Sequence, residues 1–140
     1  MKFNEIQQDD WDELKPYLDT CLLPLTGLSG EESPWAVTRA LEELRDIMDL
    51  VEIPYKGRVV TYPAVQYGSE DNLMIAAVAN LCEKLKADSF KYVILITADD
   101  RLAKLSFKGQ DLLFSPSNLT ADINEARAKV VSEVQKLWNN

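Results

Sequence analysis

Short apolar runs alternate along this 140-residue chain with longer segments in which apolar residues recur every three or four positions. The short runs predict buried β-strands, because each is bounded by residues that favour turns. The run YVILITA is the most apolar of them, and we expect it to be a central strand that is buried on both faces. The four predicted strands are residues 19–25, 58–62, 92–98 and 111–114.

The longer periodic segments predict amphipathic helices. One begins at Ser33 and Pro34 and continues to about Val51, since serine is a favoured N-cap and proline suits the first helical position. The last helix begins at about Thr120 and presents one apolar face. A short helical turn is expected after the third strand, from Asp99.

A further helix lies between the second and third strands. Ser69 is its predicted N-cap, and residues 73–85 are apolar on nearly every side. We therefore expect this helix to be heavily buried against the sheet, with Leu81 and Leu85 among the most buried residues.

The order of these elements predicts a single α/β domain over residues 1–140. Strands that alternate with helices form a mainly parallel sheet with helices on both faces, connected by right-handed crossovers. For four strands we expect a three-layer, flavodoxin-like arrangement with the spatial order 2-1-3-4. The connection before the fourth strand spans about a dozen residues, so both a parallel strand and an antiparallel edge strand remain open.

Composition limits the chemistry of the protein. With 46% apolar and 27% charged residues, the chain is long enough to fold as one domain without disulfides or metals. Cys21 and Cys82 both lie in apolar segments, which favours buried, inert thiols in a reducing compartment. We expect a cytoplasmic protein, because no apolar run has the length of a membrane span and the first residues contain no signal-peptide core. The complete lack of histidine excludes catalytic triads and zinc sites that need it.

The charge distribution argues against two classes of partner. The net charge is −8, and the whole acidic excess lies in the first 70 residues. We find no cluster of lysine and arginine interleaved with aromatic residues. We therefore expect no nucleic acid and no membrane among the partners, whereas the acidity by itself keeps a small domain soluble.

Two segments carry a resemblance to a known family. Residues 19–25 read DTCLLPL, and residues 56–67 read KGRVVTYPAVQY. They resemble the YpiF-like proteins, an uncharacterised family of small cytoplasmic proteins from spore-forming Gram-positive bacteria. These proteins share an aspartate–threonine start to an LLPL-type strand, followed later by a glycine–arginine-led strand that continues into a proline–alanine and aromatic segment. The resemblance covers most of the chain and implies a bacterial, cytoplasmic protein, but it brings no known activity or catalytic residues.

The loop over residues 26–33 lies between a strand and a helix, where many proteins bind phosphate. It lacks the lysine of a P-loop and the three-glycine spacing of a dinucleotide site. Glu31 and Glu32 would also repel a phosphate. The pattern therefore favours a turn into a capped helix.

Asp99 and Asp100 directly follow the predicted central strand. Carboxylates at this position often bind divalent metals in phosphoryl-transfer enzymes. The favoured interpretation is structural, with Asp99 as a helix cap and Asp100 as an anion in the first turn. We accordingly expect no metal and no cofactor, unless these two aspartates bind one.

Six carboxylates stand at the predicted starts of helices, which a parallel sheet gathers at the edge formed by the carboxyl ends of its strands. We call the set Glu31, Glu32, Glu70, Asp71, Asp99 and Asp100 the carboxyl-edge rim. A functional rim would attract a metal ion or a basic partner segment, whereas a structural one would only cap helices. Polar and aromatic residues near the strand ends join the candidate ligand- or partner-binding residues, which are Thr26, Glu31, Glu32, Tyr62, Glu70, Asp71, Thr97, Asp99 and Asp100.

These observations favour a non-enzymatic α/β module that binds a partner protein or a small ligand, with a homodimer as an open alternative. Caps and turns account for every junction between a strand and a loop, and no nucleophile–base pair stands out. The alternative is a divalent-metal-dependent enzyme that acts on a phosphorylated or nucleotide substrate through Asp99 and Asp100.

Overall fold

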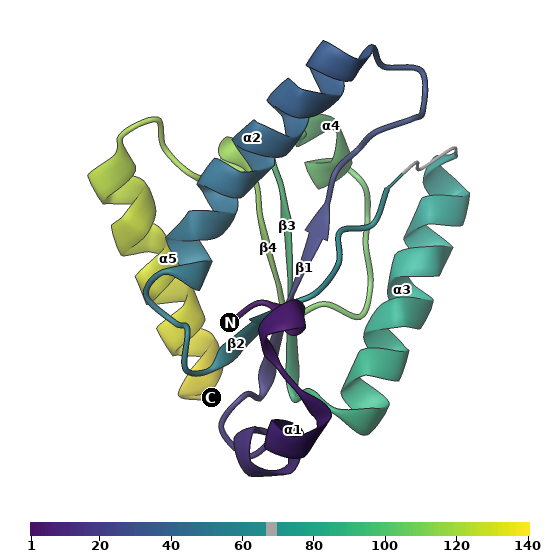
Figure 1. Ribbon diagram of the computed structural model, residues 1–140. Coiled ribbons are helices and arrows are strands. Elements are labelled where there is room, and N and C mark those ends of the chain that lie inside the picture. The colour runs from purple at the N-terminus through teal and green to yellow at the C-terminus, as the bar shows by residue number, and fades with distance from the viewer. Residues whose placement is uncertain (67–69) are drawn as a thin grey trace.

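The predicted strands form one four-stranded sheet in which all neighbours are parallel (Figure 1). The computed structural model describes residues 1–66 and 70–140. The strand order β2-β1-β3-β4 confirms the predicted order, and helices on both faces complete a three-layer α/β domain. The strands are β1 (Thr20–Leu25), β2 (Val59–Thr61), β3 (Tyr92–Thr97) and β4 (Leu112–Phe114).

The predicted helices are present, and their ends follow the expected capping residues in part. Ser33 is the N-cap residue of the first long helix and Pro34 its first helical residue, although the serine side chain makes no capping hydrogen bond. The last helix is capped by Asp122, whose carboxylate accepts two backbone N–H bonds. The predicted N-cap Ser69 lies outside the described residues. The helices are η1 (Phe3–Glu5), α1 (Gln8–Leu14), α2 (Pro34–Glu52), α3 (Asp71–Asp88), α4 (Asp100–Ala103), η2 (Pro116–Asn118) and α5 (Ile123–Trp138).

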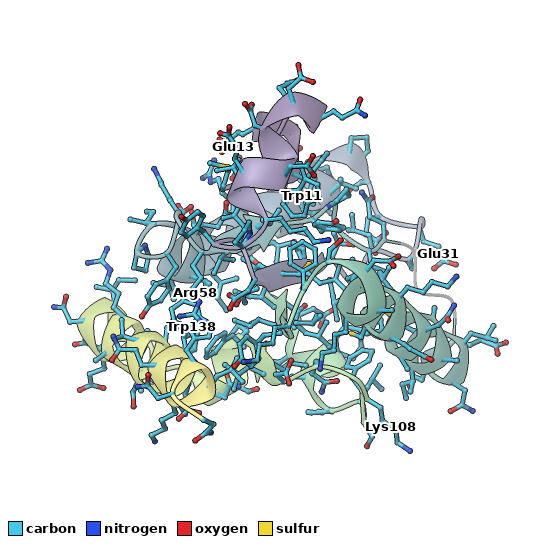
Figure 2. All side chains as sticks on the ribbon, turned by 90° about the horizontal axis from the view of Figure 1, so that it is seen from below. Trp11, Glu13, Glu31, Arg58, Lys108 and Trp138 are labelled. Carbon is cyan, nitrogen blue, oxygen red and sulfur yellow. The ribbon has the colours of Figure 1, made fainter. Side chains whose placement is uncertain are left out.

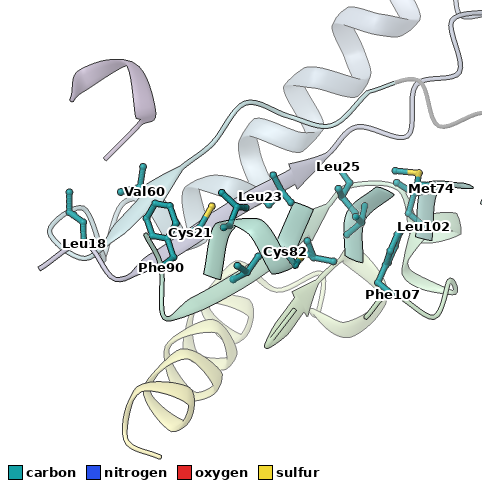
Figure 3. Close-up of a cluster of buried hydrophobic side chains, with 14 residues drawn as sticks. Leu18, Cys21, Leu23, Leu25, Val60, Met74, Cys82, Phe90, Leu102 and Phe107 are labelled. Atoms are coloured by element: carbon teal, nitrogen blue, oxygen red, sulfur yellow. The ribbon is translucent and has the colours of Figure 1, made fainter. Parts of the chain in front are cut away.

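Two hydrophobic cores lie on opposite faces of the sheet. Side chains alternate along β1, so that Leu22 packs in the core under α2 and α5, whereas Cys21 and Leu23 pack in the core under α3. Figure 3 shows the second of these cores, which also includes Phe90 and Phe107. The sheet is therefore covered on both sides, as a parallel sheet requires.

The connection between β3 and β4 settles the open question about the fourth strand. Ile94, Leu95 and Ile96 pair in parallel register with β4. Leu102 and Phe107 of this connection pack on the same face of the sheet as α3. The segment therefore connects β3 to the parallel β4 over that face without a long helix. From β1 the chain passes through α2, on one face of the sheet, to β2. From β2 it passes through α3, on the opposite face, to β3 on the other side of β1, so both crossovers have the same hand.

Two features of the helices differ from the sequence predictions. The N-terminal α1 was not expected, because Trp11 and Leu14 are its only large apolar residues and such a short helix has little periodic signal. The prediction that α3 is buried on nearly every side is wrong. Leu73 is 60% exposed and Leu81 is only partly buried, because a helix on an open sheet face contacts that sheet along one side. The buried side of α3 consists of Met74, Val78, Cys82 and Leu85.

An aromatic and ionic cluster ties the amino ends of β1 and β2 to α5. The Arg58 guanidinium makes two hydrogen bonds to the Asp19 carboxylate, at 2.9 and 3.1 Å, and lies 3.9 Å from the centre of the Trp138 ring (Figure 2). The Trp138 Nε1 donates a 2.9 Å hydrogen bond to the Thr20 hydroxyl. These contacts hold the amino ends of β1 and β2 against the C-terminal end of α5.

Two leucines of α3, one exposed and one buried, test this arrangement. Leu85→Ala should lower the free energy of unfolding by about 2–5 kcal/mol, because the side chain is only 8% exposed. Leu73→Ala makes the same change at an exposed position and should alter it by less than about 0.5 kcal/mol. Urea denaturation of both variants measures the difference, and equal losses would contradict the orientation of α3.

Candidate functional site

The carboxyl-edge rim surrounds two adjoining hollows that meet at Gly27 and Arg101. The first hollow, of about 310 Å³, is lined by residues of the β1–α2 loop, α2 and α4. The second, of about 160 Å³, lies between that loop and the first turn of α3. The acidic residues are Glu32, Glu43, Asp99 and Asp100 in the first hollow and Glu70 and Asp71 in the second.

The structure thus brings five of the six rim carboxylates to these hollows. The sixth, Glu31, is exposed in the β1–α2 loop and is not among the lining residues. Glu43 lines the first hollow but was missed, because it lies in the third turn of α2 rather than at a helix start. Glu43 lies three residues after Ala40, which lines the same hollow. This helical spacing places both residues on one side of α2 and is the sequence signal for Glu43.

Two backbone donors of the β1–α2 loop are occupied by Glu32. Its carboxylate accepts hydrogen bonds from the Ser29 and Gly30 N–H groups at 3.0–3.1 Å, and from the Ser29 hydroxyl at 3.1 Å. These bonds, led by the one from the Ser29 backbone, lower the pKa of Glu32 to about 2. Glu32 therefore takes the place that a phosphate oxygen would occupy in a phosphate-binding loop.

Asp99 caps α4 and holds Arg101. Its Oδ1 accepts a 2.9 Å hydrogen bond from the Arg101 backbone N–H, and its Oδ2 accepts a 2.9 Å bond from the guanidinium. The same guanidinium donates to the Gly27 carbonyl at 3.1 Å. Gly27 has φ +74°, and a Cβ there would lie 2.5 Å from the Asp99 Oδ2. Only glycine combines this backbone conformation with so close an approach.

Asp100 also binds its own chain. Its Oδ1 accepts a 2.7 Å hydrogen bond from the Ser117 backbone N–H and so ties α4 to η2. Among the described residues, no three histidine, cysteine, aspartate or glutamate side chains form a group that would hold a metal ion. The sequence-based interpretation of Asp99 as a cap agrees with its hydrogen bonds.

The uncharged candidate residues are separated by the fold. Thr26 lines the first hollow, and its hydroxyl bridges the Leu28 N–H and the Val65 carbonyl. Thr97 has no exposed surface, and its hydroxyl accepts the Asp99 N–H at 3.1 Å. Tyr62 does not line either hollow but packs edge-to-face on Phe90, with 5.4 Å between ring centres. Its ring packs in the apolar cluster that includes Trp11, so Tyr62 lies away from the two hollows of the rim.

The cysteines lie away from the rim, in the core under α3. Burial raises the pKa of the Cys21 thiol, with a smaller contribution from neighbouring Cys82. Burial also raises the pKa of Cys82. Such thiols are poor nucleophiles at neutral pH.

The fold and this edge define an all-parallel α/β domain with an acidic edge, where three of the rim carboxylates are held by the chain's own donors. Residues 9–138 match a family model described as "Protein of unknown function (DUF2487)", and the chain belongs to this family. No curated protein and no solved structure matches the chain. Among the helices of residues 1–66 and 70–140, none combines the length and the apolar character needed to cross a membrane.

Gly27 offers a test of the junction between the two hollows. Gly27→Ala should lower the free energy of unfolding by more than about 1 kcal/mol, because alanine is strained at this φ and its Cβ displaces Asp99 from Arg101. Gly57→Ala is the matched control, since no heavy atom lies within 4 Å of the new Cβ, and it should change stability by less than about 1 kcal/mol. Denaturant unfolding distinguishes them, and equal stabilities would contradict the close approach at Gly27.

The lowered pKa of Glu32 predicts how the stability of the β1–α2 loop depends on pH. Its pKa in the folded protein is below its ordinary value of 4.5, so the ionised side chain stabilises the loop above about pH 4.5 and this contribution disappears as the pH falls through about 2. A carbon-13 NMR titration of the Glu32 carboxyl should have its midpoint near pH 2. The amide signals of Ser29 and Gly30 should follow the same titration and lose it in Glu32→Gln. A midpoint near 4.5 would show that these hydrogen bonds do not form.

Proposed function

We propose that the protein is a non-enzymatic binding module that holds a cationic segment of a partner protein at its carboxyl-edge rim. The observation that carries this proposal is the charge of the two adjoining hollows, where six carboxylates and one cation, Arg101, are found among the described lining residues. Glu32, Asp99 and Asp100 accept hydrogen bonds from the chain itself. Glu70 and Asp71 are exposed and form no ion pair among the described residues, which leaves them available to a partner.

Large exposed apolar residues near these charges favour a protein segment over a free ion. Trp35 is 70% exposed in the first turn of α2, and Leu73 is 60% exposed in the first turn of α3. The first turns of both helices lie at the carboxyl edge of the sheet (Figure 1). A lysine or arginine side chain combines a charge with an apolar stem, so it can contact both kinds of surface.

The hydrogen bonds of the rim do not favour the alternative of a metal-dependent enzyme for phosphorylated substrates. Asp99 and Asp100 serve as capping groups, and Glu32 fills the backbone donors that would bind a phosphate. The net charge of −8 also disfavours nucleic acid and anionic membranes as partners. A second copy would bring the same carboxylates to the rim, so a homodimer through this surface is disfavoured as well.

The setting of this module is part of the proposal. The resemblance of residues 19–25 and 56–67 to YpiF-like proteins supports a cytoplasmic protein of a spore-forming Gram-positive bacterium. Cys21 and Cys82 are buried and free, which is consistent with a reducing compartment.

The test uses octalysine as the cationic probe and a pair of charge-matched variants. Octalysine should shift the amide NMR signals of the β1–α2 loop and of the first turn of α3. The double variant Glu70→Gln, Asp71→Asn should weaken binding about fivefold, because two exposed carboxylates contribute up to about 1 kcal/mol together. Raising the salt concentration should weaken the wild-type interaction further.

The control removes the same charges at the opposite end of the molecule. Asp12→Asn with Glu13→Gln changes an adjacent aspartate and glutamate in α1, which lies beyond the amino ends of the strands (Figures 1 and 2). This variant should bind octalysine as the wild type does. Equal losses in both double variants would show attraction to net charge alone and would overturn the rim as the binding site.

A further inference from the structure

A second surface lies between α2 and α5, on the face of the sheet opposite α3. Two hollows, of about 590 and 400 Å³, follow the junction of these helices. They share Asp46, Leu50 and Ile123, so they form one continuous groove, which we call the α2–α5 groove. Sequence periodicity did not indicate this groove, because it depends on how two distant helices lie side by side.

The walls of the α2–α5 groove are apolar. Ile47 and Leu50 of α2 and Leu119 before α5 line it and continue into the core beneath. At its borders Ile53 is 62% exposed and Ile123 is 50% exposed. Isoleucines that converge on one groove form a contiguous apolar surface, which in soluble domains marks sites of interaction.

The border of the groove carries an excess of negative charge. Glu43, Asp46 and Asp49 project from α2, whereas Arg127 of α5 is the one cation among the described lining residues. Asp46 has an ion pair with Arg45 at 3.4 Å, and both side chains are largely exposed. The three carboxylates occur at three-residue steps, so they follow one side of α2 along the groove.

We propose that the α2–α5 groove binds an amphipathic helix of another protein, with apolar residues in the groove and lysine or arginine along its acidic border. The groove follows α2 from Glu43 to the C-cap residue Ile53, which has helical backbone angles, and this span corresponds to about 15 Å of helix. This length accommodates three turns of a bound helix, with apolar contacts at positions i, i+3 or i+4, and i+7.

Charge complementarity selects this occupant over a second copy of the chain. A second copy that brought its own α2 border to this groove would place Glu43, Asp46 and Asp49 of each copy against an equally acidic border. A cationic helix removes that repulsion and covers Ile53 and Ile123 at the same time. The groove uses a different face of α2 from the one packed on the sheet, where Leu44 and Val51 are buried.

The test uses a labelled 18-residue peptide of leucine and lysine with its leucines on one helical face. Fluorescence anisotropy should show at least tenfold tighter binding than for a scrambled peptide of the same composition. A leucine–glutamate peptide with the same helical pattern should bind at least tenfold more weakly. Equal binding of the scrambled peptide would overturn the helical groove, and equal binding of the glutamate peptide would overturn the cationic partner.

Matched variants locate the interaction. Ile53→Ser and Ile123→Ser should each weaken binding of the leucine–lysine peptide about tenfold, while the melting temperature remains close to that of the wild type, because both side chains are half exposed or more. Tyr17→Ser changes a residue that is 69% exposed and lines neither the groove nor the hollows of the rim, and it should leave peptide binding unchanged. Loss of binding in Leu73→Ser, or in the Glu70→Gln, Asp71→Asn variant, with full binding in the isoleucine variants would assign the peptide to the rim and overturn the groove.

Sedimentation of the protein without peptide tests the remaining occupant. The wild type should remain monomeric at concentrations at which it binds the leucine–lysine peptide. A dimer that Ile53→Ser dissociates would show that the α2–α5 groove is an interface between copies, and it would overturn the proposed helical partner.

Discussion

The parallel pairing of β1 with β3 is the constraint on which the rest of the structure depends. The two strands pair from Thr20 and Tyr92 to Leu25 and Thr97, and they are buried along their whole length. Parallel neighbours need crossover connections, so helices cover both faces of the sheet. The same geometry brings the starts of α2, α3 and α4 to one edge, where their acidic residues meet.

An edge that gathers so many carboxylates is tolerated because the chain supplies donors for several of them. Glu32 accepts hydrogen bonds from N–H groups of the β1–α2 loop, and Asp99 accepts them from the backbone N–H and the guanidinium of Arg101. Asp100 accepts a hydrogen bond from the Ser117 N–H. Glu70 and Asp71 are exposed at the start of α3, where the helix dipole offsets part of their repulsion. The rim therefore combines carboxylates that build the edge with exposed carboxylates that form no ion pair among the described residues.

The sequence predicted the sheet well, because apolar runs and alternating elements are local signals of a parallel α/β fold. It also predicted the cap at Asp99, since capping depends on residues two or three positions apart. The orientation of Leu81, the packing of Tyr62 on Phe90 and the α2–α5 groove were not predicted. Each depends on the rotation of a helix or on segments far apart in the chain, and periodicity does not determine either.

The two proposed binding surfaces are joined through α2. Glu43 lines both the first hollow of the rim and the α2–α5 groove, so the acidic surface continues from one to the other. One side of α2 is fixed against the sheet by Leu44 and Val51, which leaves its outer sides to form a wall of each surface. Solubility alone requires no particular arrangement of charge, so the alignment of Glu43 and Asp46 beside exposed isoleucines supports the proposed binding surface. A partner that contacts both surfaces would gain from the high effective concentration of the second contact once the first has formed.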